Sequence, residues 1–265
     1  MSFLNQVSVL ILTFNEASNI GRTLEALRAF SEIVVLDSGS ADATLDIVRH
    51  FPNTRSVVRP FDGHAVQWNY GLVACGLERE WVLALDADYC LPQTLVDEIA
   101  GLSPVNSMSG YRASFRYCVL GHPLARSLYP PTVVLYRRSK ARYVQEGHTQ
   151  RVLIEGDIDD LRDRIYHDDR KPLSHWLASQ QNYAKLEIDH LFSKPQNKLS
   201  AIDKIRLLAW PAPILMFIYV CFVRGCVLDG WHGWFYILQR TLTETMFTVE
   251  IVDRRLRNRA STSFE

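Results

Sequence analysis

The sequence has few cysteines, no excess of charge of either sign and none of the common nucleotide- or metal-binding signatures. Its five cysteines include no Cys-x-x-Cys pair and no Cys/His spacing of a zinc site, which favours free thiols in a reducing compartment. Lys and Arg number 29, as do Asp and Glu, so the net charge does not indicate a nucleic-acid-binding protein. No Gly-x-Gly-x-x-Gly, P-loop lysine, Gly-x-Ser-x-Gly turn or His-Glu-x-x-His is present. No basic segment precedes the first apolar run, so we expect no signal peptide.

Short apolar runs alternate with segments of helical spacing over the first hundred residues. The run VSVLIL at 7–12 is typical of a strand that is buried on both faces. The alternation predicts βαβ units and therefore an α/β fold, with a Rossmann-like, mostly parallel sheet and helices on both faces. Strands are expected at residues 7–12, 32–36, 55–58 and 81–85, and helices at 18–30, 43–50, 63–77 and from Pro92 onwards. A chain of 265 residues, 48% of them hydrophobic, is long enough to bury such a core.

The second half follows a different pattern, with three further strands and then a helical C-terminal region. Strands are expected at 110–120, 132–137 and 157–167, and a helix at 173–192. Residues 207–223 form an uncharged stretch of 17. As a helix it would be about 26 Å long, which is shorter than the ~30 Å core of a bilayer. Residues 231–251 have the spacing of an amphipathic helix, and four arginines follow it.

Three interpretations of the C-terminal region are open. It can be a pair of core helices, a membrane-surface anchor or re-entrant hairpin, or a spanning helix. Residues 194–265 hold 10 basic and 6 acidic residues. Interfacial tryptophans with a basic tail are typical of attachment to anionic lipid. We therefore expect residues 193–265 to be a helical membrane-association region at the cytoplasmic face of the cell membrane.

Carboxylates and other polar groups follow the predicted parallel strands. Asp86 and Asp88 come directly after residues 81–85, and Asp37 follows the second strand. Because the carboxyl ends of parallel strands form the ligand crevice of such a sheet, these groups are expected to lie together. Carboxylate oxygens favour Mg²⁺ or Mn²⁺, which in turn hold phosphate oxygens. A buried carboxylate such as that of Asp37 needs a partner, for which a base or a ribose is a candidate.

Three motifs, in this order, carry a resemblance. Thr-x-Asn-Glu at 13–16, Asp-Ser-Gly-Ser at 37–40 and Asp-Ala-Asp at 86–88 resemble the nucleotide-sugar-binding half of family 2 glycosyltransferases. The resemblance implies the GT-A fold, with a donor half at 1–109 and an acceptor half at 110–192 of one domain, 1–192. The segments GHTQRV and HDDRKPLSHWLASQQNYAKLE resemble the bacterial branch that includes lipopolysaccharide-core β-glucosyltransferases.

The resemblance also implies a role for each matched residue. Those that bind the donor are Thr13, Asn15, Glu16, Asp37, Gln67, Asn69 and Asp86. Of these, Asp37 would contact the base or ribose, and Asp86 the ribose or donor sugar. Asp88 would ligate the metal ion, Mg²⁺ or Mn²⁺, that binds the diphosphate.

Two positions depart from the family pattern. Tyr89 stands where the metal motif of this branch often has a further acid. A His-Glu pair, whose acid is a candidate base in this branch, is replaced here by the stretch QEGH at 145–148. Glu146 and His148 are therefore the candidates for the catalytic base, and the other possibilities are Asp160, His167 and Asp168.

Together these features predict a metal-dependent, inverting glycosyltransferase. It would move a hexose from a nucleoside-diphosphate sugar, a UDP-sugar by the resemblance, to a saccharide or lipid-linked acceptor in the synthesis of cell-envelope polysaccharide. It would bind the membrane surface and no nucleic acid. One alternative is a degenerate relative that binds nucleotide or membrane without turnover. Another is a sugar nucleotidyltransferase, which usually needs a Gly-rich loop with a basic residue where this chain has residues 13–16.

Overall fold

The computed structural model describes residues 2–146 and 149–262 and divides the chain into two compact units. The first comprises Met1–Pro123 and Tyr129–Lys171, and the second comprises Leu124–Leu128 and Pro172–Glu265. The division thus falls after residue 171, whereas the sequence predicted a boundary after residue 192. The difference arises because helix α5 (Leu173–Ser193) packs its apolar side chains into a core that it shares with the C-terminal helices.

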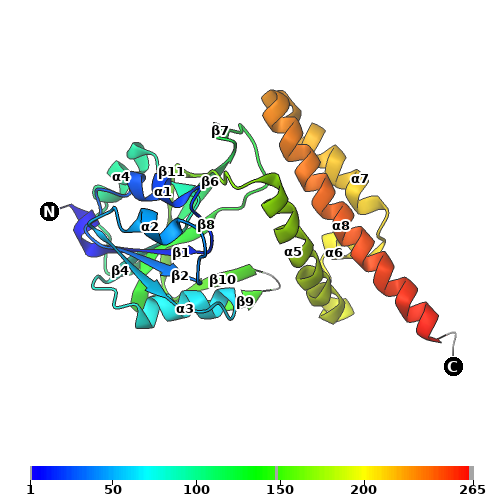
Figure 1. Ribbon diagram of the computed structural model, residues 1–265, viewed down its shortest axis with the longest axis horizontal. Coiled ribbons are helices and arrows are strands. Elements are labelled where there is room, and N and C mark those ends of the chain that lie inside the picture. Colours follow the sequence, from blue (N-terminus) through cyan, green and yellow to red (C-terminus); the bar gives the residue numbers. More distant parts are fainter. Residues whose placement is uncertain (1, 147–148, 263–265) are drawn as a thin grey trace. The chain divides into compact units, whose positions relative to one another are not determined.

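The first unit is built on one large sheet, one half of which is parallel as the βαβ pattern predicts (Figure 1). The parallel strands, in spatial order, are β3 (Thr54–Val58), β2 (Ile33–Asp37), β1 (Val7–Thr13) and β4 (Trp81–Asp86). The sheet continues with β8 (Thr132–Arg137), β6 (Met108–Val119), β11 (Asp157–His167) and β5 (Tyr89–Cys90), and β7 (His122–Pro123) pairs with β6. Strand β8 is antiparallel to both of its neighbours, whereas β6 and β11 are parallel. The α/β class predicted from the sequence is confirmed.

Helices and a hairpin cover the two faces of this sheet. They are η1 (Phe3–Gln6), α1 (Ile20–Ala26), α2 (Thr44–Val48), α3 (His64–Ala74), α4 (Gln93–Ala100), η2 (Arg138–Lys140), and the hairpin of β9 (Ala141–Glu146) and β10 (Thr149–Ile154). Val9 and Ile11 of β1 lie in a core with α1, α2 and α4. Leu10, between them, lies in the other core with α3 and the hairpin. Strand β1 is therefore buried on both faces, as its apolar run predicts.

The register of the parallel strands brings their polar ends together. Thr13 of β1 pairs with Asp37 of β2, and Leu12 pairs with Asp86 of β4. All three strands therefore end at the same level, and the residues that follow them share one edge of the sheet. We call this the donor edge, and it is the convergence that the sequence predicted.

The second unit is helical. Its elements are α5, η3 (Gln196–Lys198), α6 (Ala201–Leu207), α7 (Pro211–Ile218), a π-helical turn at Tyr219–Val223, η5 (Cys226–Asp229) and α8 (Gly230–Thr262). Its core consists of Ala184, Ile188, Leu191, Ala209, Phe247 and Ile251. Inside it the Arg206 guanidinium contacts both carboxylate oxygens of the buried Glu244.

The uncharged stretch at 207–223 is broken into separate elements. Ala209 adopts a positive φ of 67° between α6 and α7, and α7 begins at Pro211. A proline at the first helical position loses nothing by lacking an N–H, but it cannot continue a helix from before it. Among the described residues no single helix is both long and apolar enough to cross a membrane. Pro211–Val223 and Cys226–Ala260, which are bent by 67° at their break, pass that test of length and composition only as a pair.

Candidate active site

Asp37 organises the loops at the donor edge. Its carboxylate is fully buried and accepts hydrogen bonds from the hydroxyls of Thr13 (2.9 Å) and Ser40 (2.5 Å). It also accepts from the backbone N–H groups of Gly39 (2.9 Å) and Ser40 (2.8 Å). A carboxylate has about four acceptor positions, so the loop itself supplies the partners that this buried group needs. The contact of Asp37 with a base or ribose stays a prediction.

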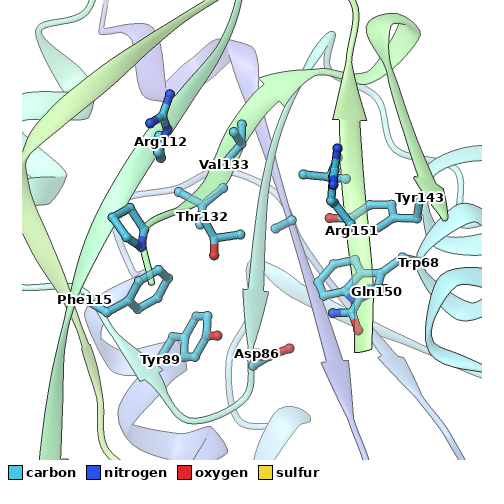
Figure 2. A pocket seen from close by; sticks show the side chains of 14 residues that line it. Trp68, Asp86, Tyr89, Arg112, Phe115, Thr132, Val133, Tyr143, Gln150 and Arg151 are labelled. Atoms are coloured by element: carbon cyan, nitrogen blue, oxygen red, sulfur yellow. The ribbon is translucent and has the colours of Figure 1, made fainter. Parts of the chain in front are cut away.

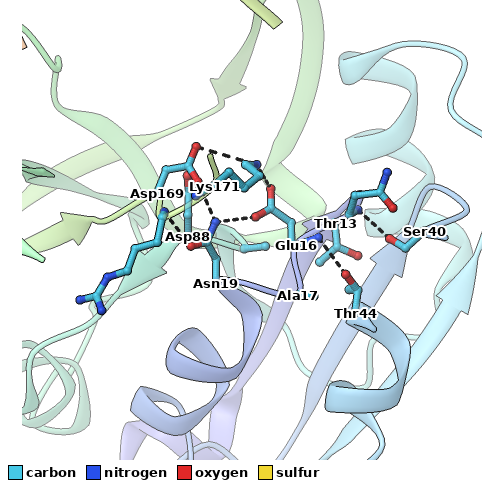
Figure 3. Close-up of polar contacts among 12 residues, drawn as sticks. Thr13, Glu16, Ala17, Asn19, Ser40, Thr44, Asp88, Asp169 and Lys171 are labelled. Carbon is cyan, nitrogen blue, oxygen red and sulfur yellow. Dashed lines mark hydrogen bonds and ion pairs between the residues drawn. The ribbon is translucent and has the colours of Figure 1, made fainter. Parts of the chain in front are cut away.

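The loop after β1 is fastened to the loop after β2. The backbone N–H of Asn15 donates to Ser40 Oγ, and that of Glu16 donates to Thr44 Oγ1, each at 2.8 Å (Figure 3). The Asn15 side chain accepts from the backbone N–H of Ala41 at 2.9 Å. Asn15 has a positive φ of 54°, a conformation that asparagine tolerates better than most residues. This turn directs the Glu16 side chain away from Ser40 and Thr44 and towards Lys171 (Figure 3).

Gln67 and Asn69, both on α3, brace the surrounding loops. Gln67 is fully buried and donates to Ser38 Oγ at 3.2 Å. The Asn69 amide pairs with the backbone N–H and carbonyl of Tyr143, each at 2.9 Å, and so joins α3 to the β9–β10 hairpin. The described contacts of both residues are with the chain itself, and a contact with the donor stays a prediction.

Asp88 is brought against His167 by strand pairing. The two-residue strand β5 pairs antiparallel with the end of β11, with Tyr89 opposite His167. The His167 Nε2 atom lies 3.0 Å from Asp88 Oδ2. Burial favours the neutral carboxyl, but the neighbouring His167 and Lys171 outweigh it, so the pKa of Asp88 is lowered. For His167 the signs are opposite, because burial of the imidazolium lowers its pKa and the Asp88 carboxylate raises it. The net effect is that the pKa of His167 is raised.

Aromatic rings surround the His167 imidazole. The ring centroids of Tyr129, Tyr117 and Tyr89 lie 4.7, 5.1 and 5.3 Å from that of His167, all in edge-to-face arrangements. The Tyr89 and Tyr129 hydroxyls are 2.5 Å apart. Among the residues that the structure describes, buried His167 Nδ1 has no hydrogen-bond partner. The tyrosine at the position where the family pattern has an acid therefore helps to hold the imidazole that faces Asp88.

Asp86 is a carboxylate held in an unfavourable environment. Burial, together with the charge of Asp88 close by, raises the pKa of Asp86 to about 6. Burial costs the charged form its hydration, and Asp88 adds repulsion between like charges. Such a carboxylate gains from any cation that enters the donor edge.

Glu16 lies in an ion pair with Lys171. The Lys171 Nζ atom is 2.5 Å from Glu16 Oε1 and 3.9 Å from Asp169 Oδ2 (Figure 3). The Asn19 amide bridges the two carboxylates, since it donates to both Glu16 and Asp169 at 2.8 Å. Burial raises the pKa of Glu16 to about 7, because the Lys171 ammonium offsets only part of the lost hydration. The segment after β11 is thus attached to the loop after β1.

Asp168 anchors the same segment from the other side. Its buried carboxylate accepts from the Gly121 backbone N–H (2.9 Å) and from Arg170 Nε (2.9 Å). Arg22 donates to the Asp168 carbonyl at 2.8 Å. These contacts fix residues 168–170 independently of any ligand.

A cavity of about 360 Å³ opens beside Asp86 (Figure 2). Its lining includes the aromatic residues Trp68, Tyr89, Phe115 and Tyr143, the cations Arg112 and Arg151, and the carboxylate of Asp86. The Trp68 and Tyr143 rings are stacked, with centroids 5.2 Å apart. The buried Trp68 Nε1 has no hydrogen-bond partner among the described residues. Aromatic surfaces with a few polar groups at this size suit a small organic ligand such as a sugar ring.

The structure describes the candidate bases to different extents. Glu146 is the last residue of β9, opposite Thr149 in the hairpin, and its side chain is not described. His148 lies outside the described residues. Asp160 is 70% exposed and pairs with Arg112 at 3.4 Å. The base therefore stays a prediction on Glu146 and His148.

The residues at the donor edge fit part of a divalent metal site. Among the described residues no cluster of three or more His, Cys, Asp or Glu side chains forms a complete set of ligands. Asp88 and His167 nevertheless present an oxygen and a nitrogen 3.0 Å apart. Mg²⁺ is usually bound through one or two carboxylates together with waters and substrate phosphates. A site of this kind needs only some of its ligands from the protein.

Residues 8–102 match the model of the family described as Glycosyl transferase family 2. This part of the chain is similar to family 2 glycosyltransferases, and the protein is a glycosyltransferase. This match covers the parallel strands and the donor edge. Together with the strand order, it makes the fold GT-A-like.

Similar proteins carry related names. The lipopolysaccharide core biosynthesis glycosyltransferase LpsC of Rhizobium meliloti is 27% identical over 201 residues, which cover 69% of this chain and 70% of that protein. An uncharacterized glycosyltransferase of Rickettsia bellii is 24% identical over 246 residues, covering 86% and 80%. Among solved structures, S. aureus TarS 1-349 in complex with UDP-GlcNAc aligns over 91% of this glycosyltransferase and 81% of that chain, at 18% identity and a TM-score of 0.47.

Several residues of the site were missed from the sequence. The sequence patterns indicate no role for Lys171, Asp169 and Asn19, although the run DDRK at 168–171 directly follows a predicted strand. A dense group of charges at a strand end is the signal that points to them. His167 was considered only as a possible base, whereas its observed partner is Asp88.

The first prediction concerns stability and pH. The pKa of Glu16 is about 7 in the folded protein and near its ordinary 4.5 in the unfolded chain. The folded state therefore holds a proton that the unfolded state releases, and stability is lost as the pH rises from about 4.5 to about 7. Glu16→Gln removes this dependence. The Tm of this variant, relative to that of the wild type, should rise between pH 5 and pH 8. Glu25→Gln, at a carboxylate that is 59% exposed, is the control. A Tm difference between Glu16→Gln and the wild type that stays constant from pH 5 to pH 8 would contradict the account.

Proposed function

We propose that this glycosyltransferase moves a hexose, with inversion, from a nucleoside-diphosphate sugar to a saccharide or lipid-linked acceptor of the cell envelope. The observation that carries the proposal is the donor edge, where Asp37, Asp86 and Asp88 follow the ends of neighbouring strands and Asp86 lines a cavity of about 360 Å³. The resemblance favours a UDP-sugar as donor. Similarity to LpsC, whose name places it in lipopolysaccharide core biosynthesis, supports an envelope acceptor.

Asp88 and His167 would hold Mg²⁺ or Mn²⁺ together with the diphosphate of the donor. When bound, such an ion neutralises the charge that develops on the leaving diphosphate. The loop held by Asp37 would receive the base and ribose, because its backbone is ordered before any ligand arrives. Such preorganisation lowers the entropy that binding must lose.

The sugar would lie in the cavity beside Asp86, with the acceptor following it. Trp68 and Tyr143 line this cavity with stacked rings, which offer an apolar surface to a sugar face. In the inverting reaction the acceptor oxygen attacks the anomeric carbon as the bond to the diphosphate breaks. A base, Glu146 or His148 by the resemblance, accepts the hydroxyl proton.

The donor proposal predicts a metal-dependent nucleotide site that requires Asp88. Thermal unfolding with UDP, GDP, CDP and TDP, each with and without Mn²⁺, should show one nucleotide that raises the Tm only with the metal. A ligand at 100 times its Kd stabilises by about 2.7 kcal/mol. Asp88→Ala should abolish the shift, whereas Asp97→Ala, at an exposed carboxylate on α4, should keep it. A wild-type protein that responds to no diphosphate would overturn the proposal.

We also propose that the second unit attaches the enzyme to the cytoplasmic face of the membrane. Its α7, the π-helical turn, η5 and the first half of α8 expose a series of large apolar side chains. They are Trp210, Ile214, Leu215, Ile218, Tyr219, Phe222, Val223, Leu228, Trp231, Phe235 and Leu238. Trp231 is 86% exposed and Phe222 69%. Exposed apolar side chains in such number mark an interaction surface, and the four arginines in the last turns of α8 would favour anionic lipid.

Vesicle binding tests this attachment. The wild type should sediment with vesicles that contain anionic lipid and less with zwitterionic ones. The pair Phe222→Ser/Trp231→Ser should weaken binding at least about tenfold, since each side chain contributes about 1.5–3 kcal/mol when buried. Val73→Ser/Val105→Ser removes two exposed apolar side chains of the first unit and should not change binding. Equal sedimentation of both pairs would show that this surface does not bind lipid.

A further inference from the structure

Lys171 is a buried cation whose described ion pairs are all with carboxylates beside the donor edge. Its side chain is 14% exposed. Its ammonium lies 2.5 Å from Glu16 Oε1 and 3.9 Å from Asp169 Oδ2. Lysine is rarely buried unless it is paired. The pairing with Glu16 fixes the ammonium next to a residue of the loop that follows β1.

The charge of Lys171 also reaches the Asp-Ala-Asp motif. Burial and Asp88 raise the pKa of Asp86, and the Lys171 charge offsets part of that rise. The same charge, with that of His167, helps to lower the pKa of Asp88 against the effect of burial. The ammonium therefore lies within electrostatic range of three carboxylates, on Glu16, Asp86 and Asp88. A diphosphate that binds beside Asp88 would bring further negative charge into this group, so a protein cation close to it is needed.

The two arginines next to the Lys171 segment, Arg22 and Arg170, are committed to other partners. Arg22 donates to the carbonyls of Ser18 (3.0 Å) and Asp168 (2.8 Å). Arg170 is held by the Asp168 carboxylate through Nε and Nη2, at 2.9 and 2.8 Å. Both guanidinium groups are thus fixed by the segment after β11. The Lys171 ammonium, with its three rotatable donors and flexible stem, is suited to changing partners.

We propose that Lys171 binds the diphosphate of the donor, exchanging part of its contact with Glu16 for a phosphate oxygen. This inference rests on the proposed nucleotide-sugar function and adds a residue to it. In the ligand-free protein Glu16 keeps the ammonium in place and neutralised. When the diphosphate arrives, Lys171 supplies a positive charge from the protein in addition to that of a metal ion.

The experiment compares UDP affinity among charge variants in the presence of Mn²⁺, by calorimetric titration of the full chain. Lys171→Met should weaken UDP binding by about 10- to 100-fold, the range expected for a hydrogen bond between charged groups. Lys171→Arg should recover most of the affinity, because it keeps the charge. Lys140→Met, at an exposed lysine of the same unit, should bind UDP like the wild type.

A double variant separates binding from mere neutralisation of Glu16. Lys171→Met leaves Glu16 as a buried, unpaired carboxylate, which by itself is destabilising. Glu16→Gln/Lys171→Met removes both members of the pair, and its ligand-free Tm shows that it folds. If Lys171 binds the diphosphate, the double variant binds UDP more weakly than Glu16→Gln alone.

Three results would overturn the inference while leaving the proposed function standing. They are UDP binding by Lys171→Met within twofold of the wild type, equal UDP affinity in the double variant and in Glu16→Gln alone, and an equal loss in Lys171→Arg and Lys171→Met. A wild-type protein that binds no nucleoside diphosphate would instead overturn the proposed function, and this inference with it.

Discussion

The contact between Asp88 and His167 depends on strand pairing, and the rest of the site depends on that contact. Strand β5 turns back from the end of β4 and pairs with the end of β11, so two residues that are 79 positions apart meet at 3.0 Å. The same pairing carries the segment 168–171 to the donor edge, where Lys171 reaches Glu16. Without it, Glu16 after β1 and Asp88 after β4 would lose their partners from the second half of this unit.

Burying several carboxylates at the donor edge costs free energy, and three kinds of contact offset part of that cost. Asp37 is stabilised by four hydrogen bonds from its own loop, and Asp88 by His167. Glu16 is stabilised only partly by Lys171, and Asp86 is left with a pKa of about 6. The unfavourable energy that remains in these charged carboxylates favours the binding of a cation.

Sequence patterns predicted β1, β2 and β4 because each is a continuous apolar run that is buried on both faces. They also predicted which strand ends carry carboxylates, since Asp37, Asp86 and Asp88 directly follow such runs. The β9–β10 hairpin was not predicted, because its strands pair with each other and their polar residues weaken the periodicity. The pairing of Asp88 with His167 was beyond reach, since it depends on a two-residue strand. The break at Ala209 and Pro211 was signalled by the proline, but the assignment of α5 to the second unit depends on packing that no local pattern records.

The central claim is that Asp88 and His167 hold a divalent ion together with the donor diphosphate. Pulsed electron paramagnetic resonance on the Mn²⁺ complex with UDP tests it most directly, because it detects the nuclei bound to the metal. We predict a ³¹P coupling from UDP together with a ¹⁴N coupling from one imidazole, and loss of the ¹⁴N signal in His167→Ala. A ³¹P coupling without any ¹⁴N coupling in the wild type would remove His167 from the site. Mn²⁺ that shows no ³¹P coupling would contradict the account as a whole.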